Sequence, residues 1–191
     1  MNELLAGLRI DRVATPRLDT AILVDERAEG EAVVFVHGNV SSSLFWQESI
    51  LALPAGFRGI ALDLRGFGAS ETAGIDATRG LRDFSDDLHS LLTTFGLDSA
   101  HLVGWSMGAG VTMQFLLDHP NMVKSLTLVS PISPYGFGGS MTAAGTRTTA
   151  DDAGTGGGGV NPDFVAALAA GDRSADAPTS PRNILNTMYF A

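Results

Sequence analysis

Short apolar runs alternate with longer amphipathic segments along the chain up to Pro131. Apolar and β-branched residues dominate positions 32–36, 59–63, 100–103 and 125–130. Runs of this length and character are typical of strands that are buried on both faces of a parallel sheet. Scattered β-formers over residues 8–23 predict two further short strands.

Helical spacing of apolar residues marks the segments between these strands. Segments 44–53 and 79–95 carry large apolar side chains near every third or fourth position, and residues 109–117 predict another helix. Strands that alternate with helices in this way form right-handed βαβ units. We therefore expect an α/β fold, in which a mostly parallel sheet carries helices on both of its faces.

The character of the chain changes after Pro131. Residues 142–159 are rich in Gly, Ala, Thr and Asp, and only two short helices are expected beyond them, near 162–170 and 182–191. Asn161 is placed to cap the first of these helices. The sequence therefore predicts a core domain over residues 1–131 and a separate segment over residues 132–191.

The motif Gly104-Trp105-Ser106-Met107-Gly108 joins a predicted strand to a predicted helix. A serine at the tip of a strained strand-to-helix turn is the nucleophile-elbow arrangement. Glycines are needed on both sides of the serine because the turn brings backbones too close for side chains. The helix N-terminus favours negative charge beside the serine. One alternative is a chance match, but the predicted strand before the motif and the helix after it argue against this. The other is a membrane span over 99–117, and the polar residues and glycines of that run argue against it.

Composition narrows the class of function. The chain has 191 residues and a formal net charge of −9, with a pI near 4.7. An acidic chain is expected to have neither nucleic acid nor an anionic membrane as its main partner. The absence of cysteine excludes disulfides, thiol catalysis and cysteine metal sites, and no motif predicts a metal or a cofactor. The N-terminus lacks a leader pattern, so a cytoplasmic location is expected.

Several motifs together resemble the α/β-hydrolases. The His37-Gly38 loop after a strand, the loop at 63–70 and the elbow at Ser106 occur in the order seen in that family. The sequence Asp118-His119-Pro120 before the last predicted strand is also similar. The resemblance covers about residues 33–131 and implies an α/β-hydrolase core that is incomplete on its C-terminal side. The segment after Pro131 looks like the start of the cap of such an enzyme.

The resemblance also implies roles for individual residues. Ser106 would be the nucleophile, and the backbone N–H groups of Asn39 and Met107 would form the oxyanion hole. The candidates for lining the pocket, with a place in the core as the alternative, are His37, Trp105, Phe45 and Trp46. Haloalkane dehalogenases and epoxide hydrolases of this fold use a carboxylate nucleophile. A serine at 106 therefore favours acyl chemistry on a small ester, a lactone or another acyl substrate.

The base and the acid that activate such a serine are not identified in the sequence. In this fold the acid and then the histidine follow the serine, but only His119 does so, at the far end of the following helix. Of the remaining histidines, His101 is expected in the core, His89 at the surface and His37 in the oxyanion loop. We therefore expect the N-terminal portion of a hydrolase, complemented by a C-terminal segment or a second chain.

Two other functions stay open: an acyltransferase or perhydrolase on the same fold, and a non-catalytic binding module that keeps the pocket. The remaining charged residues are expected to have structural roles. Asp63 and Arg65 are expected to hold the loop between them, and a solvated helix face is expected for Asp83, Asp86 and Asp87.

Overall fold

The chain divides into two compact units, residues 1–136 and residues 137–191. The structure, a computed structural model, describes residues 4–26, 29–76, 79–134, 146 and 161–189. Most of the glycine-rich stretch that was expected to begin a cap lies outside the described residues.

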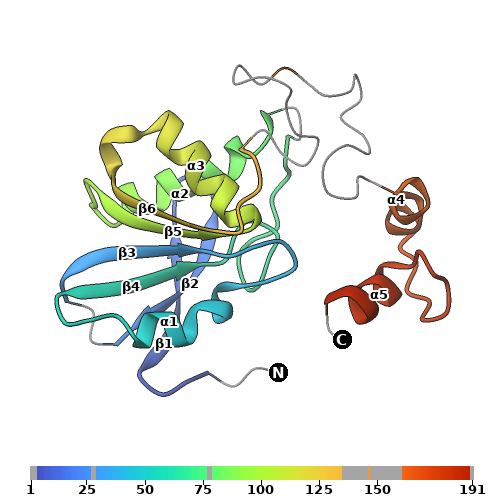
Figure 1. The fold of residues 1–191 in the computed structure, drawn as a ribbon, viewed down its shortest axis with the longest axis horizontal. Helices are drawn as coiled ribbons and strands as arrows, with labels where there is room; N and C mark the ends of the chain where they lie inside the picture. Colours follow the sequence, from blue (N-terminus) through green and yellow to red (C-terminus); the bar gives the residue numbers. More distant parts are fainter. Residues whose placement is uncertain (1–3, 27–28, 77–78, 135–145, 147–160, 190–191) are drawn as a thin grey trace. The chain divides into compact units, whose positions relative to one another are not determined.

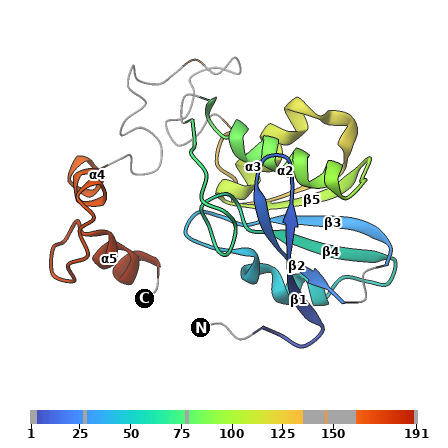
Figure 2. The same cartoon turned by 180° about the vertical axis from the view of Figure 1, so that it is seen from behind.

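A six-stranded sheet in the order β1-β2-β4-β3-β5-β6 forms the first unit (Figure 1). The strands are β1 (Leu8–Ala14), β2 (Asp19–Asp25), β3 (Glu31–Val36), β4 (Phe57–Leu62), β5 (Ala100–Trp105) and β6 (Val123–Val129). Neighbours from β4 to β6 run parallel, whereas β1 and β2 form an antiparallel hairpin that joins the sheet through β2. Figure 2 shows this hairpin from behind. The predicted mostly parallel sheet is confirmed.

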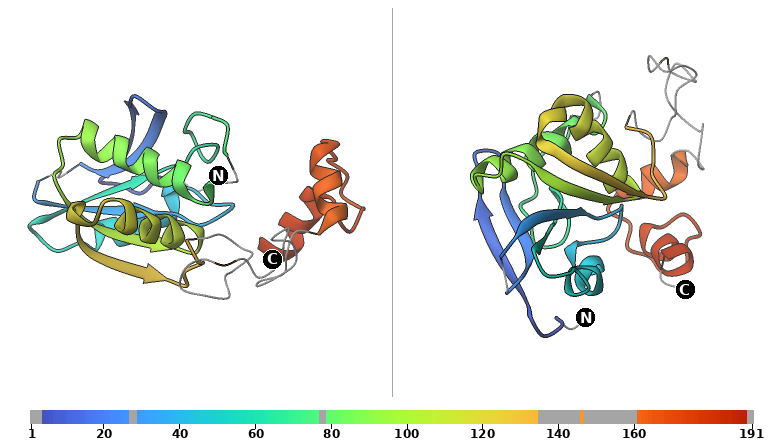
Figure 3. Two further views of the ribbon diagram at one scale, coloured as in Figure 1. Left: turned by 90° about the horizontal axis from the view of Figure 1, so that it is seen from above. Right: turned by 60° about the vertical axis from the view of Figure 1, so that its left-hand side comes forward.

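Helices cover both faces of the sheet, as predicted. Helices α2 (Arg82–Thr94) and α3 (Met107–Asp118) lie side by side on one face (Figure 3). On the other face lie the 3-10 helix η1 (Ser43–Trp46) and α1 (Gln47–Leu51). Two separate apolar clusters fill the layers: the larger lies under α2 and α3, and the smaller, which contains Phe35, Trp46 and Ile50, lies under α1.

The sheet has two edge strands: β1, which carries the charged residues Arg9, Asp11 and Arg12, and β6. Strand β2 is almost wholly buried between β1 and β4. Strand β6 has no strand on its outer side among the described residues, and its apolar residues Leu128 and Val129 are 38% and 40% exposed. An apolar edge of this kind is a site where a further strand can pair.

The expectation of a solvated acidic face on α2 was wrong for two of its three aspartates. Asp83 and Asp87 are buried. Asp87 accepts two hydrogen bonds from the Arg65 guanidinium, at 2.5 and 2.6 Å, and one from Arg17 Nε at 2.9 Å. Arg79 pairs with Asp83 and with Asp86. Arg17 comes from the β1–β2 turn and Arg65 from the loop after β4, so helical periodicity could not reveal that they cover this face, whereas Arg79 stands four residues before Asp83.

The second unit contains short helices: α4 (Pro162–Ala169), α5 (Pro181–Ile184) and the π-helix η4 (Leu185–Tyr189). The side chain of Asn161 accepts a hydrogen bond from the Asp163 N–H, which confirms the predicted cap of α4. The η3 turn (Pro120–Met122) completes the elements of the first unit. Across the described part of the chain, no helix has the length and apolar character that a membrane crossing requires.

Candidate active site

Ser106 lies on a sharp bend between β5 and α3. Its backbone has φ 54° and ψ −117°, a conformation that non-glycine residues avoid. The bend is fixed by hydrogen bonds: Ser106 N–H donates to the Val129 carbonyl at 2.9 Å, and the Ser106 carbonyl accepts from the N–H groups of Ala109 and Gly110 at 3.1 and 3.2 Å. The surrounding structure therefore holds the serine in a conformation that costs on the order of 1–3 kcal/mol.

Backbone strain gathers at one edge of the sheet. Among the described residues, the non-glycine residues with positive φ are Val40 (53°), Ser106 (54°) and Ser130 (44°). They follow the carboxyl ends of β3, β5 and β6, which lie next to one another in the parallel part of the sheet. Ligand sites of such sheets lie at this edge, and strained residues cluster at functional sites.

The elbow glycines are required by close backbone contacts, as the motif predicted. A Cβ at Gly104 would lie 2.5 Å from the Cα of Ala109 in α3. A Cβ at Gly108 would lie 2.3 Å from the carbonyl oxygen of Val36, at the end of β3. Both contacts are with backbone atoms that cannot move aside, so α3 can pack against β5 and β3 only without side chains at these positions.

The loop after β3 lies directly against the serine. A Cβ at Gly38 would be 3.0 Å from Ser106 Cβ and 2.9 Å from the ring of Trp105. Asn39, the next residue, is half-buried, and Met107 is the first residue of α3, whose first N–H groups have no acceptor within the helix. This arrangement is compatible with the predicted oxyanion hole, and the donor roles of Asn39 and Met107 stay a prediction.

His37 is a structural residue of this loop. It is fully buried, and its Nε2 accepts a hydrogen bond from the Leu64 N–H at 3.1 Å. The other ring nitrogen, Nδ1, must then carry the proton that it shares with the Gly38 carbonyl at 2.7 Å. Burial lowers the pKa of His37, against the opposing effects of the Gly38 carbonyl and Asp63. A neutral ring with both nitrogens occupied has no free nitrogen to take a proton from Ser106, and a place for His37 in a pocket lining stays a prediction.

Asp63 joins the loops after β3 and β4. Its buried carboxylate accepts hydrogen bonds from the Ser43 N–H at 2.6 Å and from the Ala69 N–H at 2.8 Å. Ser43 is thus tied to Asp63 through its backbone N–H, and η1 begins without a side-chain cap. Asp63 and Arg65 both hold their loop in place, as expected, but through different partners.

The aromatic candidates separate into core and surface. Trp46 is buried and packs against Phe35, with ring centroids 5.1 Å apart. Phe45 is 52% exposed and stacks on Trp105 at 4.2 Å. Trp46 and His37 are therefore buried, whereas Phe45 and Trp105 form a stacked aromatic pair, of which Trp105 directly precedes Ser106.

The other histidines are occupied elsewhere. His119 caps the C-terminus of α3, and this helix of 12 residues is about 18 Å long at 1.5 Å per residue. There it stacks on His89 at 4.0 Å, so His89 is half-buried rather than at the open surface. His101 was expected in the core, but it lies on the half-exposed face of β5 and contacts Ser125 and Glu31. The described residues also contain no group of three His, Asp or Glu side chains that could hold a metal ion.

Comparison with known proteins supports the geometry. Residues 31–174 match the family model of the alpha/beta hydrolase fold. The chain is 39% identical over 108 residues to a probable lysophospholipase, BODYGUARD 4, of Arabidopsis thaliana, a match of 55% of this chain and 25% of the relative. It is 41% identical over 104 residues to a putative carbamate hydrolase, RutD, of Variovorax paradoxus, covering 54% of this chain and 39% of the relative.

A third relative extends the range of named substrates. The chain is 32% identical over 127 residues to a 2-hydroxy-6-oxononadienedioate/2-hydroxy-6-oxononatrienedioate hydrolase of Comamonas testosteroni, covering 64% of this chain and 43% of the relative. The structure of a Vigna radiata epoxide hydrolase mutant aligns with a TM-score of 0.60 and 27% identity, over 65% of this chain and 39% of that one. The chain thus spans between a quarter and about two fifths of the length of these proteins. The chain belongs to the α/β-hydrolase fold family.

Proposed function

We propose that this chain carries the nucleophile of a serine hydrolase that acts on a small acyl substrate. In the proposed reaction the Ser106 hydroxyl oxygen attacks the substrate carbonyl, and its proton passes to a general base. The leaving group then departs, and water hydrolyses the ester formed on Ser106. The observation that carries the proposal is the strained bend at Ser106, which faces the Gly38 loop and precedes the N-terminus of α3.

The proposed oxyanion hole uses backbone donors on both sides of the serine. The Met107 N–H lies at the start of α3, and the Asn39 N–H belongs to the loop that contacts Ser106 through Gly38. One donor aimed at a developing oxyanion lowers the activation free energy by on the order of 3 kcal/mol. His37 and Asp63 would act indirectly, because their hydrogen bonds fix the conformation of this loop.

The proposed general base is not one of the histidines of this sequence. His37 uses both ring nitrogens, His89 and His119 stack at the far end of α3, and His101 is bonded to Ser125 and Glu31. We propose that a histidine and an acid from a C-terminal segment or a second chain complete the site. The open edge of β6, which follows β5 in the sheet, supports a strand from that polypeptide as the means of attachment.

The substrate class follows from the nucleophile and remains broad. A serine hydroxyl forms an acyl ester and suits an ester, a lactone, a thioester or an activated ketone. It does not suit the alkyl ester chemistry of a carboxylate nucleophile, so likeness to an epoxide hydrolase supports the fold rather than that reaction. The placement of the histidines favours one alternative, a binding module that keeps the pocket without catalysis.

Labelling with a fluorophosphonate probe, followed by peptide mapping, tests the proposal. We expect the probe to modify Ser106 in the wild-type chain and to leave Ser106→Ala unmodified. Ser125→Ala is the control, and its Ser106 should still be labelled. Because no base is at hand, labelling should be slow and esterase turnover undetectable for this chain alone. A modified serine other than Ser106, or rapid turnover by a monomer, would contradict the proposal.

A further inference from the structure

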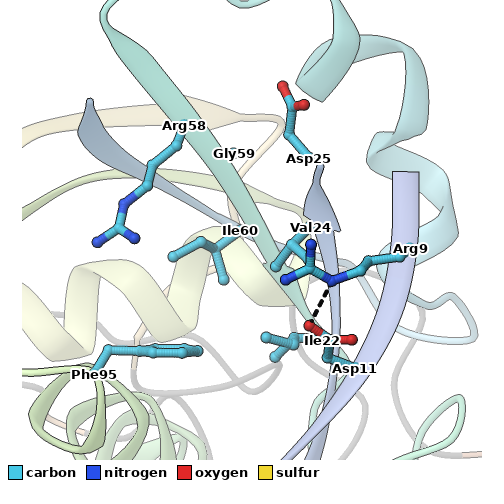
Figure 4. A pocket seen from close by; sticks show the side chains of 9 residues that line it. All are labelled: Arg9, Asp11, Ile22, Val24, Asp25, Arg58, Gly59, Ile60 and Phe95. Atoms are coloured by element: carbon cyan, nitrogen blue, oxygen red, sulfur yellow. Dashed lines mark hydrogen bonds and ion pairs between the residues drawn. The ribbon is translucent and has the colours of Figure 1, made fainter. Parts of the chain in front are cut away.

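A hollow of about 100 Å³ is lined by residues of β1, β2 and β4 and by Phe95, which follows α2 (Figure 4). Its strand residues include Arg58, Gly59 and Ile60, near the start of β4, whereas Ser106 follows the carboxyl end of β5. The hollow is therefore separate from the proposed active site, and no step of the proposed reaction uses it.

Strand register explains why polar and apolar side chains meet in this hollow. Cross-strand partners share a face, so Arg9 lies beside Val24, and Val24 lies beside Ile60. Asp11 and Ile22 form the next pair along the hairpin. Ile22, Val24 and Ile60 make an apolar floor, and the ring of Phe95, at the end of α2, forms a wall (Figure 4).

The charges around this floor leave one guanidinium without a counter-ion. Arg9 pairs with Asp11 at 2.9 Å, so their charges offset each other. Arg58 lies next to the floor on β4, and within the described part of the chain its buried Nε has no hydrogen-bond partner and its guanidinium forms no ion pair. Asp25 also lines the hollow, but strand alternation places its side chain on the opposite face of β2 from Val24 (Figure 4).

We propose that this hollow binds a short-chain monocarboxylate of three or four carbons. The carboxylate would accept hydrogen bonds from the Arg58 guanidinium, because a guanidinium matches a carboxylate in charge and in geometry. The alkyl tail would lie on Ile22, Val24 and Ile60. An apolar cavity of about 150 Å³ holds benzene, so a hollow of about 100 Å³ suits a smaller tail and leaves the charged group at the rim.

Titration of the 191-residue chain with sodium butyrate, followed by isothermal calorimetry and amide NMR, tests the proposal. We expect saturable binding in the millimolar range, with shifts at Ile22, Ile60 and Phe95, and at least about tenfold weaker binding of 1-butanol. Arg58→Gln should weaken butyrate binding by about tenfold or more and leave butanol unchanged. Arg9→Gln is the matched control, and it should change butyrate binding by less than about threefold because the charge of Arg9 is already paired.

The outcomes that overturn the proposal are distinct. Equal affinity for butyrate and butanol would show an apolar site without anion recognition. Shifts confined to residues around Ser106 would assign the ligand to the proposed active site instead. An unchanged butyrate affinity in folded Arg58→Gln, with its fold checked by circular dichroism, would exclude Arg58 as the recognising group. The absence of saturable butyrate binding in the millimolar range would exclude the site altogether.

Discussion

The bend at Ser106 and the charged face of α2 are held in place by different kinds of contact. At the bend, backbone packs on backbone: Gly108 meets the carbonyl of Val36, and Gly104 meets α3. On α2, buried aspartates are held by arginines from the β1–β2 turn and from the segment between β4 and α2. The bend depends on the absence of Cβ atoms at Gly104 and Gly108, whereas the α2 face depends on a balance of opposite charges. Added side chains should therefore destabilise the first region, and removed charges the second.

The largest effect is expected at Gly108. A valine there would place its Cβ 2.3 Å from the Val36 carbonyl and 2.4 Å from that of His37. Since backbone at the end of a central strand cannot retreat, Gly108→Val should lower the free energy of unfolding by more than about 3 kcal/mol, measured by urea denaturation. Gly74→Val is the control, because a Cβ at Gly74 meets no atom within 4 Å. Equal stability of the two variants would mean that α3 does not pack on β3 as described.

A comparable but smaller loss is expected when the charge balance is broken. Asp87→Asn would leave the Arg65 guanidinium, which is 7% exposed, without its carboxylate. Removing one partner of a buried pair costs about 3–5 kcal/mol, and the neighbouring carboxylates of Asp83 and Asp86, which also act on Arg65, can offset part of that loss. The exposed pair of Arg9 and Asp11 supplies the control, since Asp11→Asn should cost at most about 1 kcal/mol. Similar losses in the two variants would contradict the buried network.

The pH dependence of stability should report on the loop before the bend. The folded pKa of His37 lies below its ordinary value because the ring is buried, so the unfolded chain binds more protons near that pH. Stability is therefore complete above about pH 6.5 and decreases as the pH falls toward the folded pKa. His37→Gln should remove part of this slope in thermal unfolding scans between about pH 7 and 5. An unchanged slope would show that His37 is not buried in the neutral form.

The smallest change in stability is expected at Gly38. A Cβ there meets the Trp105 ring and Ser106 Cβ at 2.9 and 3.0 Å, closer than ordinary contacts but wider than the 2.3 Å contact at Gly108. Gly38→Ala should therefore cost only about 1–2 kcal/mol but should slow fluorophosphonate labelling of Ser106 by about tenfold, because the loop is displaced. Normal labelling by the alanine variant would separate the Gly38 loop from the chemistry of Ser106.

The same contrast explains what could be predicted from the sequence. The bend was predictable because Gly104 and Gly108 mark backbone contacts at fixed spacing around Ser106, and the apolar runs marked the strands. The pairs that Asp87 forms with Arg17 and Arg65 were not predictable, because these arginines reach the helix only after the chain has folded. The pair of Arg79 and Asp83 has i,i+4 spacing and could have been expected. For the same reason the place of His101, and the division of the aromatic candidates into buried Trp46 and exposed Phe45, required the structure.

The account depends most on Ser106 accepting an acyl group, and the mass of the acylated protein measures this directly. The chain is incubated with p-nitrophenyl acetate, quenched in acid and analysed by intact-mass spectrometry and peptide mapping. We expect a single acetyl group on Ser106 that persists, because deacylation also needs a base and no histidine of the chain is placed to supply one. Ser106→Ala should remain unmodified. Wild-type protein without an adduct, or with the acetyl group on another residue, would contradict the account.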